Sequence, residues 1–342
     1  MSSAWQISSF GMEHLQRVEL PDPDLGPEQV KVRVKACSIN YRDALMVKGL
    51  YNPKQPLPLV PLSDGAGEVV AVGERVTEWK VGDRVAATFF QDWQGWPVPS
   101  RDRIRQTRGG PLPGMLQETT VLHPHELVRL PEHLSFVEGA TLPCAALTAW
   151  SALVAQGSLS SSDTVLIQGT GGVALFALQF AVMQGARVIL LSSSDERLRQ
   201  AEELGAWAGI NYTKQPEWFR EVLALTNKQG VTHVVELGGA NTLNQSVRCI
   251  RPGGFIAMIG VLGGAELPFN VLPVVMQNVR LQGVLVGNRQ DFLRMNEAIE
   301  HHQLRPVVSH RFPFAEAPRA MEALSQGGAF GKVVIDFEED VT

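Results

Sequence analysis

The sequence predicts an α/β protein in which a doubly wound parallel sheet is joined to a second, β-rich domain. Three observations carry this prediction. Residues 1–145 contain short strands, residues 146–287 alternate between strands and helices, and residues 288–342 add one more helix and a closing strand. Alternating strands and helices are typical of a parallel sheet with helices on both faces. The middle region is therefore expected to form one domain, and the two outer regions the other.

The length and composition exclude several classes of protein. With 342 residues, of which 44% are apolar and 19% charged, the chain suits two soluble globular domains. A net charge of −5 argues against a nucleic-acid partner. No apolar stretch reaches the roughly 18 residues of a membrane span, and the first residues lack the layout of a signal peptide. One basic cluster occurs in the chain and comprises Arg101, Arg103, Arg105 and Arg108. We expect it to be a solvated loop surface.

Cysteine usage indicates the compartment. Cys37, Cys144 and Cys249 stand far apart in the sequence, which is neither a disulfide framework nor a zinc cluster. This pattern fits a reducing cytoplasm.

The first region reads as β-structure. Gln29–Ala36 alternates strictly between polar and apolar residues, and Gly67–Val72 and Asp83–Ala87 are further short strand candidates between glycine-rich turns. Residues 91–114 are rich in Trp, Pro, Gly and Arg and have no period, which predicts a long loop or lobe.

The middle region and the end of the chain supply the remaining elements. Apolar runs predict strands over residues 165–167, 186–191, 233–237 and 255–261, and a closing strand over Lys332–Phe337. Helices are predicted over Val173–Gln184, Asp195–Leu204, Glu217–Thr226 and Asp291–His301.

One glycine-rich loop, QGTGGVA at residues 168–174, links the first of these middle strands to its helix. Gly169 permits a tight turn and Gly171 lets the backbone approach a phosphate, while Ala174 is an accepted occupant of the last position. Backbone N–H groups at a helix N-terminus favour an anionic pyrophosphate. The alternative is a glycine-rich turn without a ligand. The loop therefore predicts a dinucleotide site whose contacts are Gly169, Gly171, Gly172 and Val173.

The end of the second middle strand bears on which nicotinamide cofactor would bind. An acidic residue there would bond the ribose 2′-hydroxyl, but this chain has Ser192 and Ser193, with Arg197 close behind. Hydroxyl donors and a guanidinium suit a 2′-phosphate, so we expect NADP rather than NAD. The alternative role, capping of the next helix, falls on Ser194 and is compatible with this reading.

Several strings occur in an order that resembles a known family. With the glycine loop they are Ser38–Asp43, Asp64–Val70, Val81–Val85 and Phe330–Val334. Together they make the chain similar to the medium-chain dehydrogenase/reductase superfamily, and most to its zinc-independent, quinone oxidoreductase-like branch. The resemblance implies a discontinuous GroES-like catalytic domain at 1–145 and 288–342, and a Rossmann domain at 146–287.

The resemblance also places the zinc ligands of the family's alcohol dehydrogenases. Their catalytic Cys, His and Cys match Asn40, Ser63 and Cys144 here, and the region of their structural zinc, about 89–115, has no cysteine. Neither asparagine nor serine is a normal zinc ligand, and one thiolate cannot assemble a four-coordinate site. We therefore expect neither zinc site. The remaining histidines considered are expected at the surface and are His123, His125, His301 and His302.

Without zinc, the expected chemistry changes. A hydride acceptor must then already be activated by conjugation, as in a quinone, an enone or an α,β-unsaturated thioester. The resemblance implies Tyr51 as a donor to the substrate oxygen or a proton source, against the alternative of a packed loop aromatic. It implies that Asn40 holds the substrate carbonyl or the nicotinamide ribose, against the alternative of a turn-stabilising contact.

Further cofactor contacts are implied by the resemblance alone. Thr148 would lie against the nicotinamide, Tyr212 near the 2′-phosphate, and Gly260 and Val261 at the carboxamide. The other contacts implied are Asn288, Arg289 (whose alternative is a surface ion pair) and Lys332, which would face the pyrophosphate and pair with a supporting Asp43.

The same resemblance implies a homodimer formed through the strand Val279–Val286. Trp93 and Trp96 could line a substrate cleft or pack their own lobe. Two alternative functions stay open: a metal-free alcohol dehydrogenase, and a non-catalytic NADPH-binding or redox-sensing protein. The expected partner is a small-molecule substrate, with no nucleic acid and no membrane.

Overall fold

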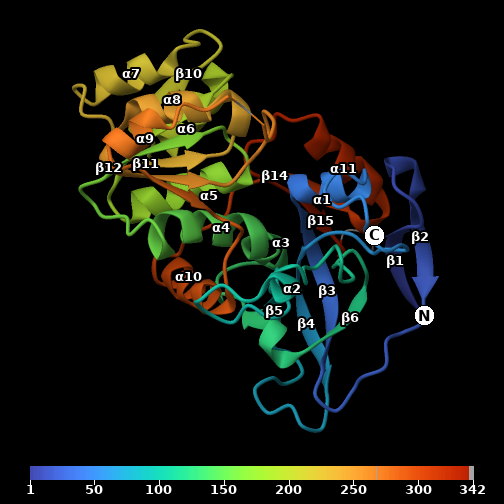
Figure 1. Cartoon of the computed structure of the whole chain (residues 1–342). Coiled ribbons are helices and arrows are strands. Elements are labelled where there is room, and N and C mark those ends of the chain that lie inside the picture. Colours follow the sequence, from blue (N-terminus) through green and yellow to red (C-terminus); the bar gives the residue numbers. More distant parts are fainter. Residues whose placement is uncertain (267, 339–342) are drawn as a thin grey trace. The chain divides into compact units, whose positions relative to one another are not determined.

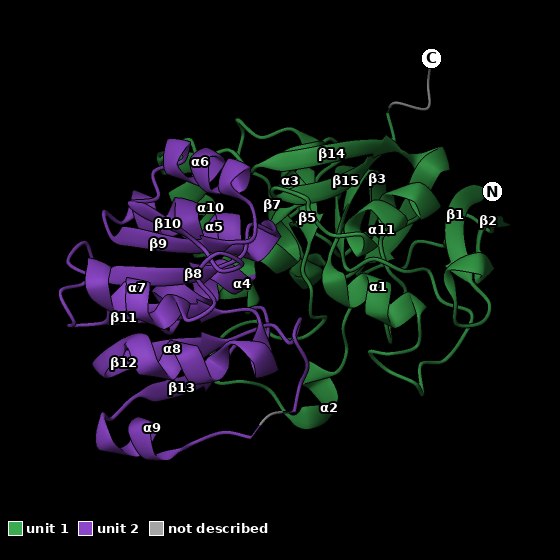
Figure 2. Ribbon diagram, turned by 90° about the horizontal axis from the view of Figure 1, so that it is seen from above, with its two compact units in different colours: residues 1–147, 287–342 green, residues 148–286 purple. Residues whose placement is uncertain are grey.

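The chain folds into two units. The computed structural model describes residues 1–266 and 268–338, and every structural statement below concerns those residues. Unit 1 comprises Met1–Leu147 and Gly287–Thr342, and unit 2 comprises Thr148–Val286 (Figure 2). None of the helices in the described ranges is long and apolar enough to cross a membrane.

Unit 1 is built on a seven-stranded sheet of order β14-β15-β3-β4-β5-β7, with β6 also paired to β3 (Figure 1). The alternation predicted at its centre is confirmed, since Val30, Val32 and Val34 are all buried. The closing strand pairs antiparallel with β3, with Val333 opposite Ile39, which brings the two segments of unit 1 into one sheet. The strands are β3 (Val30–Ile39), β4 (Asp64–Val72), β5 (Arg84–Ala87), β6 (Thr119–Leu122), β7 (Leu127–Arg129), β14 (Val308–Pro313) and β15 (Lys332–Asp336).

The remaining elements of unit 1 are short, apart from one helix of the return segment. The first residues form an antiparallel ribbon that the sequence analysis did not identify. Its strands are β1 (Ser2–Ile7) and β2 (Leu15–Leu20), and the helices of the unit are α1 (Tyr41–Val47), α2 (Arg101–Ile104), α3 (Phe136–Gly139), α10 (Arg289–His301) and α11 (Ala317–Ser325).

The segment over residues 91–114 is a packed lobe. Trp93 is buried, and its ring contacts those of Phe90 and Trp96 edge-to-face at centroid distances of 5.2 and 5.3 Å. Trp93 therefore packs its own lobe, and of the two alternatives this is the one that the structure supports for Trp93. The expected solvated basic cluster is wrong at one position: Arg108 is buried in an ion pair with Glu126, because a buried guanidinium needs a carboxylate partner.

Unit 2 is a six-stranded parallel sheet of order β10-β9-β8-β11-β12-β13. The chain runs outward from β8 in one direction and then from β11 in the other, which is the order of a doubly wound dinucleotide-binding domain. The predicted α/β fold with a parallel sheet is confirmed. The strands are β8 (Thr164–Gln168), β9 (Arg187–Ser192), β10 (Ala208–Asn211), β11 (Val231–Glu236), β12 (Ile250–Met258) and β13 (Arg280–Gly283), and the helices are α5 (Gly172–Met183), α6 (Asp195–Glu203), α7 (Trp218–Leu225), α8 (Leu243–Cys249) and α9 (Leu272–Met276).

Three strands of unit 2 differ from expectation. β12, expected over residues 255–261, spans Ile250–Met258. The sequence AGIN of β10 has one β-branched residue and no alternation, so it gave no strand signal. The strand expected over Val279–Val286 spans only Arg280–Gly283. Beyond it, Val284 N still donates to the carbonyl oxygen of Met258, the last residue of β12.

Candidate active site

The glycine loop lies at the point where the strand order reverses. It follows β8, which lies between β9 and β11 in the sheet. It leads directly into the 12-residue helix α5. Ligands of doubly wound sheets bind at this reversal, beyond the carboxyl ends of the strands. Gly169 has a φ of +81°, a conformation that L side chains rarely adopt, so the turn itself requires this glycine.

Gly171 has a different reason to be glycine. Its φ of −77° suits any residue, and a Cβ added there would meet no atom of the protein within 4 Å. Neither the backbone conformation nor packing within the protein therefore requires glycine at this position. A ligand that approaches the backbone does, because a Cβ would occupy the space of its phosphate. The loop fits the pyrophosphate of a dinucleotide.

Replacing Gly171 with alanine should separate stability from cofactor affinity. We expect the melting temperature of the free protein to stay unchanged or rise slightly, because alanine reduces the entropy of the unfolded chain. The dissociation constant of a nicotinamide dinucleotide should rise by roughly 5–150-fold, since overpacking costs about 1–3 kcal/mol. Cofactor fluorescence titration and thermal unfolding measure the two effects. Equal dinucleotide affinity in wild type and variant would place the pyrophosphate elsewhere.

Residues at the ends of β9 and β10 form the candidate 2′-phosphate site. Ser192 pairs with Asn211 across the two strands, and Tyr212 N donates to Ser192 O at 3.1 Å. Arg197 donates from its guanidinium to Ser193 Oγ at 3.2 Å. Ser194 caps α6 by accepting from Arg197 N at 3.4 Å, so the capping role and the phosphate role fall on different serines. The structure brings together the four residues that sequence analysis assigned to this end, which are Ser192, Ser193, Arg197 and Tyr212.

A buried carboxylate network at the ends of β8 and β11 was missed in the sequence analysis. Glu236 is almost fully buried and accepts from Gln168 Nε2 at 2.7 Å, Gly239 N at 3.0 Å and Gly238 N at 3.2 Å. Gln168 Oε1 in turn accepts from Leu237 N at 3.0 Å. The pair therefore ties the glycine loop to the loop after β11. A glutamate inside the apolar run HVVEL was the available signal.

Gly260 and Val261 lie beside that second loop. A Cβ on Gly260 would come within 2.2 Å of Leu237 O, so close packing of the two loops requires glycine there whether or not a cofactor binds. Val261 is exposed. The expected contacts of these two residues with the carboxamide stay predictions.

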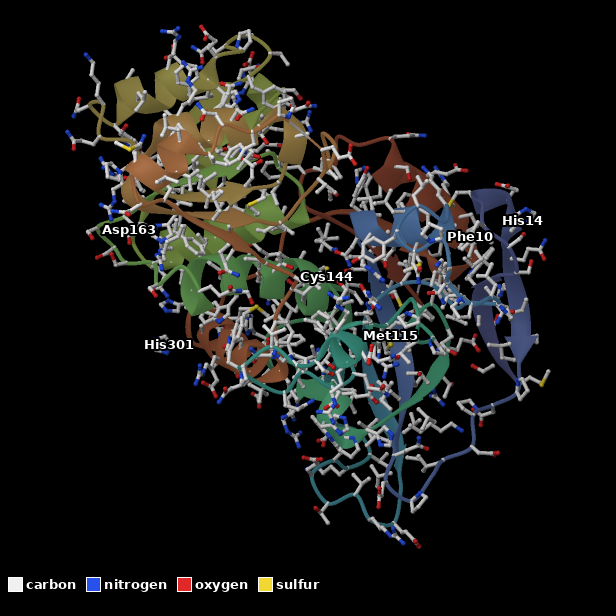
Figure 3. The ribbon with its side chains drawn as sticks, in the orientation of Figure 1. Phe10, His14, Met115, Cys144, Asp163 and His301 are labelled. Atoms are coloured by element: carbon white, nitrogen blue, oxygen red, sulfur yellow. The ribbon has the colours of Figure 1, made fainter. Side chains whose placement is uncertain are left out.

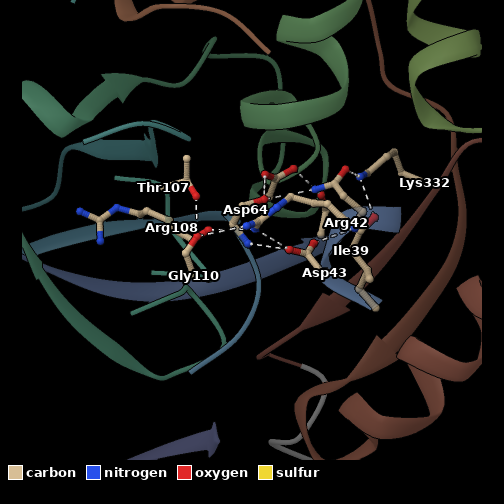
Figure 4. A network of polar contacts seen from close by, with 11 residues as sticks. Ile39, Arg42, Asp43, Asp64, Thr107, Arg108, Gly110 and Lys332 are labelled. Atoms are coloured by element: carbon tan, nitrogen blue, oxygen red, sulfur yellow. Dashed lines mark hydrogen bonds and ion pairs between the residues drawn. The ribbon is translucent and has the colours of Figure 1, made fainter. Parts of the chain in front are cut away.

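A polar cluster in unit 1 surrounds Asn40, the residue that precedes α1. Lys332 is buried, and its ammonium donates to Asn40 Oδ1 at 2.6 Å and to Ile39 O at 2.8 Å (Figure 4). The expected pair between Lys332 and Asp43 is therefore wrong. β15 runs antiparallel beside the end of β3, which delivers the ammonium to the last residue of that strand and its successor.

Asp43 takes its cation from its own helix instead. Arg42 NH1 lies 3.1 Å from Asp43 Oδ1 and also donates to Arg108 O at 2.9 Å (Figure 4). The other oxygen, Asp43 Oδ2, accepts from Asn40 N at 2.9 Å and so caps α1. Asp43 supports the backbone of Asn40, which agrees with a structural rather than a catalytic role.

The positions expected for zinc ligands hold a network of hydroxyl and amide groups. Ser63 Oγ donates to Asp64 Oδ1 at 2.8 Å, and Asn40 Nδ2 lies 3.5 Å from Ser63 Oγ. Burial, reinforced by the charge of Asp64, raises the pKa of the Cys144 thiol, whereas zinc binds a thiolate (Figure 3). The ammonium of Lys332 already occupies the side-chain oxygen of Asn40, at 2.6 Å. This donor set does not fit zinc.

Tyr51 lies in the loop after α1 and is half exposed. Its ring covers the Arg42 guanidinium, whose central carbon is 4.9 Å from the ring centroid. The packed-aromatic alternative therefore accounts for the ring but not for the phenol. The expected catalytic role of the hydroxyl stays a prediction.

The structure gives other predicted cofactor residues local partners. Asn288 caps α10, accepting from Asp291 N at 2.9 Å and donating to Asp291 Oδ2 at 2.6 Å, so its side chain is committed there. Arg289 donates to Leu127 O at 3.1 Å rather than to a carboxylate. Thr148 is buried at the start of unit 2. Contacts of all three with a cofactor stay predictions.

The polar cluster around Asn40 includes neither Trp96 nor the four histidines considered in the sequence analysis. His301 (Figure 3) and His302 are exposed at the end of α10. His123 and His125 are half-buried, and their rings stack with centroids 5.5 Å apart. The described residues contain no group of three histidine, cysteine or acidic side chains placed to hold a metal ion. Trp96 is half exposed and donates from its indole to Asp291 at 3.1 Å.

The strand order, the glycine loop and the discontinuous β-rich unit define a protein of the dehydrogenase class. Residues 26–132 match the alcohol dehydrogenase GroES-like domain family, and residues 172–301 match the zinc-binding dehydrogenase family. The chain belongs to the medium-chain dehydrogenase/reductase superfamily. It is an oxidoreductase of that superfamily, whose members bind a nicotinamide cofactor.

Two relatives and two solved structures match nearly the whole chain. A zinc-type alcohol dehydrogenase-like protein of Schizosaccharomyces pombe is 40% identical over 97% of both chains. A quinone oxidoreductase of Pseudomonas aeruginosa is 32% identical over 98% of this chain and 99% of its own. A putative alcohol dehydrogenase from Sinorhizobium meliloti superposes with a TM-score of 0.93 at 41% identity, covering 98% of both chains. A Pseudomonas syringae quinone oxidoreductase gives 0.84 at 28% identity, covering 98% of this chain and 100% of its own.

Proposed function

We propose that this protein is a zinc-independent, NADPH-dependent reductase of activated carbonyl compounds or conjugated double bonds, such as quinones and enones. The observation that carries the proposal is the side-chain set at the positions of the catalytic zinc ligands. A lysine ammonium 2.6 Å from Asn40 Oδ1 supplies a fixed positive charge there, and a divalent cation bound beside it would be repelled. A protein without a Lewis acid needs a substrate that conjugation has already activated.

The expected reaction assigns a step to each group. NADPH, when bound, supplies the hydride. As the β-carbon of an enone accepts that hydride, its π electrons move to the carbonyl oxygen, which becomes an enolate. Asn40 stabilises that oxygen by donating from its amide. The Tyr51 phenol, which is half exposed above Arg42, donates a proton to the enolate and regains one from water, which leaves the saturated ketone.

The identity of the nucleotide rests on residues of unit 2. Within the described ranges, Arg197 bonds the neutral hydroxyl of Ser193 and no carboxylate, which leaves its charge available for an anion. Lys214, the neighbouring basic residue, is already paired with Asp195. A guanidinium that pairs with no carboxylate and lies beside the Ser193 hydroxyl supports NADPH over NADH.

A turnover screen tests this proposal. The purified protein is mixed with NADPH and a panel of quinones, enones, enals and saturated aldehydes, and NADP with secondary alcohols forms the reverse panel. We expect NADPH consumption with conjugated acceptors and none with saturated aldehydes. Oxidation of alcohols alone would favour a metal-free alcohol dehydrogenase, and NADPH binding without any turnover would favour a redox-sensing protein. Stoichiometric zinc in the purified protein would overturn the proposal directly.

We further propose that two copies associate through the edge of unit 2. β13 is the last strand of its sheet and pairs only with β12 in the described part of the chain. α9 lies at the same edge (Figure 2), and its Val275 and Met276 are 68% and 74% exposed. An uncovered strand edge beside exposed apolar side chains favours pairing with another strand, and a second copy offers one.

The mass of the protein in solution checks this association. Light scattering on the wild type should give twice the mass of the 37.4 kDa chain. Met276→Glu should shift that mass toward the monomer, because a charge would be buried without a partner. The exposed Leu50 of unit 1, replaced in the same way, serves as the control. A wild-type monomer at micromolar concentration would contradict the proposal.

The other expectations about partners and location are also kept as proposals. The net charge of −5 supports a small-molecule substrate rather than a nucleic acid. Cys37 and Cys249 are buried thiols that donate to backbone carbonyls, which suits the reducing cytoplasm that we propose for this protein.

A further inference from the structure

We infer that Lys332 is a positioning residue that fixes Asn40 as a hydrogen-bond donor, so that the group Asn40 binds is an acceptor: the carbonyl oxygen of the substrate. This inference rests on the proposed function and deepens it. An asparagine amide both donates and accepts, so the sequence leaves its role at this position open. The contacts of Lys332 remove that ambiguity.

The orientation of the Asn40 amide follows from the chemistry of its partner. An ammonium has three donors and no acceptor, so the atom 2.6 Å from Lys332 Nζ must be the oxygen of the amide. The same ammonium donates to Ile39 O at 2.8 Å, which anchors it between backbone and side chain. The nitrogen of the Asn40 amide must therefore face away from Lys332.

The donor side of Asn40 is not used up by the protein. Among the described residues, Nδ2 faces two acceptors: Ser63 Oγ, at the long distance of 3.5 Å, and the carboxylate of Asp64. Ser63 is itself bound to Asp64 at 2.8 Å, which directs its hydroxyl hydrogen away from Asn40. The contact with Ser63 is weak at that distance, so a ligand oxygen can replace it as the acceptor of one N–H of the amide.

The charge of Lys332 also strengthens that donor. A cation on Oδ1 draws electron density from the amide, so its N–H groups become more positive and bind a developing oxyanion better than a neutral carbonyl. The arrangement is buried, which limits screening by water. An interaction that strengthens as charge develops lowers the barrier rather than merely binding the substrate. Lys332 thereby acts on the substrate through Asn40.

Asn40→Asp tests whether residue 40 donates or accepts. The substitution is isosteric and keeps an oxygen for Lys332, but it replaces the donor with a second acceptor. We expect kcat to fall on the order of 10²–10³-fold, the usual loss for one oxyanion donor, with the NADPH dissociation constant within about twofold of wild type. Turnover close to wild type would show that residue 40 works as an acceptor and would overturn the inference.

A double-mutant cycle tests whether Lys332 acts through Asn40. Lys332→Met should lower kcat by roughly 10–100-fold in the wild-type background, and by less than about threefold in the Asn40→Leu background. Additive losses would overturn the inference. Lys332→Arg keeps a buried cation with donors and should restore part of the rate. Lys35→Met, which removes a lysine of β3 that pairs with Glu338 at the surface, is the matched control and should leave kcat unchanged.

Two measurements keep the outcomes distinct. Thermal unfolding and NADPH binding identify variants that do not fold. If Lys332→Met does not fold, Lys332→Arg takes its place in the double-mutant cycle with Asn40→Leu. If the wild type binds NADPH but reduces no acceptor in the screen, the proposed function fails. If the wild type turns over and the cycle is additive, only the role of Lys332 fails.

Discussion

Arg42→Met should lower the free energy of unfolding of unit 1 by about 3–5 kcal/mol, the usual result of breaking a buried ion pair by removing one partner. Both side chains of this pair are buried, with 8% of Arg42 and none of Asp43 exposed. Without the guanidinium, the Asp43 carboxylate loses its ion-pair partner in a site from which water is excluded. The carbonyl groups of Arg108 and Gly110 lose a donor at the same time.

Thermal unfolding followed by circular dichroism measures this effect, with a melting temperature that falls by about 10 °C. Arg75→Met is the matched control: it makes the same substitution in an ion pair with Glu28 whose two side chains are about two-thirds exposed. That pair should contribute at most about 1 kcal/mol. Equal losses in the two variants would show that the burial of Arg42 and Asp43 does not matter for stability.

Much of the fold could be predicted because its elements carry local signals. The alternation in β3 and the strand–glycine–helix order around β8 and α5 need only neighbouring residues to be recognised. β10 has no such signal, since AGIN is a strand only because β9 offers it an edge. The aromatic packing of Trp93 likewise depends on partners that the loop brings together. Residues 91–114 have no periodic pattern that would predict this packing.

The candidate site was predicted unevenly for the same reason. Gly171 and Arg197 stand in segments whose geometry follows from the chain around them. Lys332 was assigned to Asp43 by resemblance, but its actual partner depends on the register of β15 against β3, which the sequence does not specify. Arg42 is adjacent to Asp43 and competes for the same carboxylate. Because Asp43 pairs with the adjacent Arg42, Lys332 donates to another oxygen, Asn40 Oδ1.

The choice between the two nicotinamide nucleotides should depend on Arg197. Arg197→Ala should raise the dissociation constant of NADPH by roughly 10–100-fold, since a hydrogen bond to a charged group contributes about 1.5–3 kcal/mol. NADH lacks the 2′-phosphate, so its affinity should not change. Fluorescence titration with both nucleotides measures the ratio.

Ser193→Asp should go further, because an aspartate at residue 193 would pair with Arg197 and repel the phosphate, while offering the ribose of NADH an acceptor. Arg199→Ala is the matched control, since Arg199 lies on the same helix but pairs with Glu196 and is exposed. Its loss should leave both affinities unchanged. If Arg197→Ala weakened NADPH and NADH equally, its guanidinium would support the fold of the site rather than recognise the phosphate, and the preference for NADPH would have to come from Tyr212.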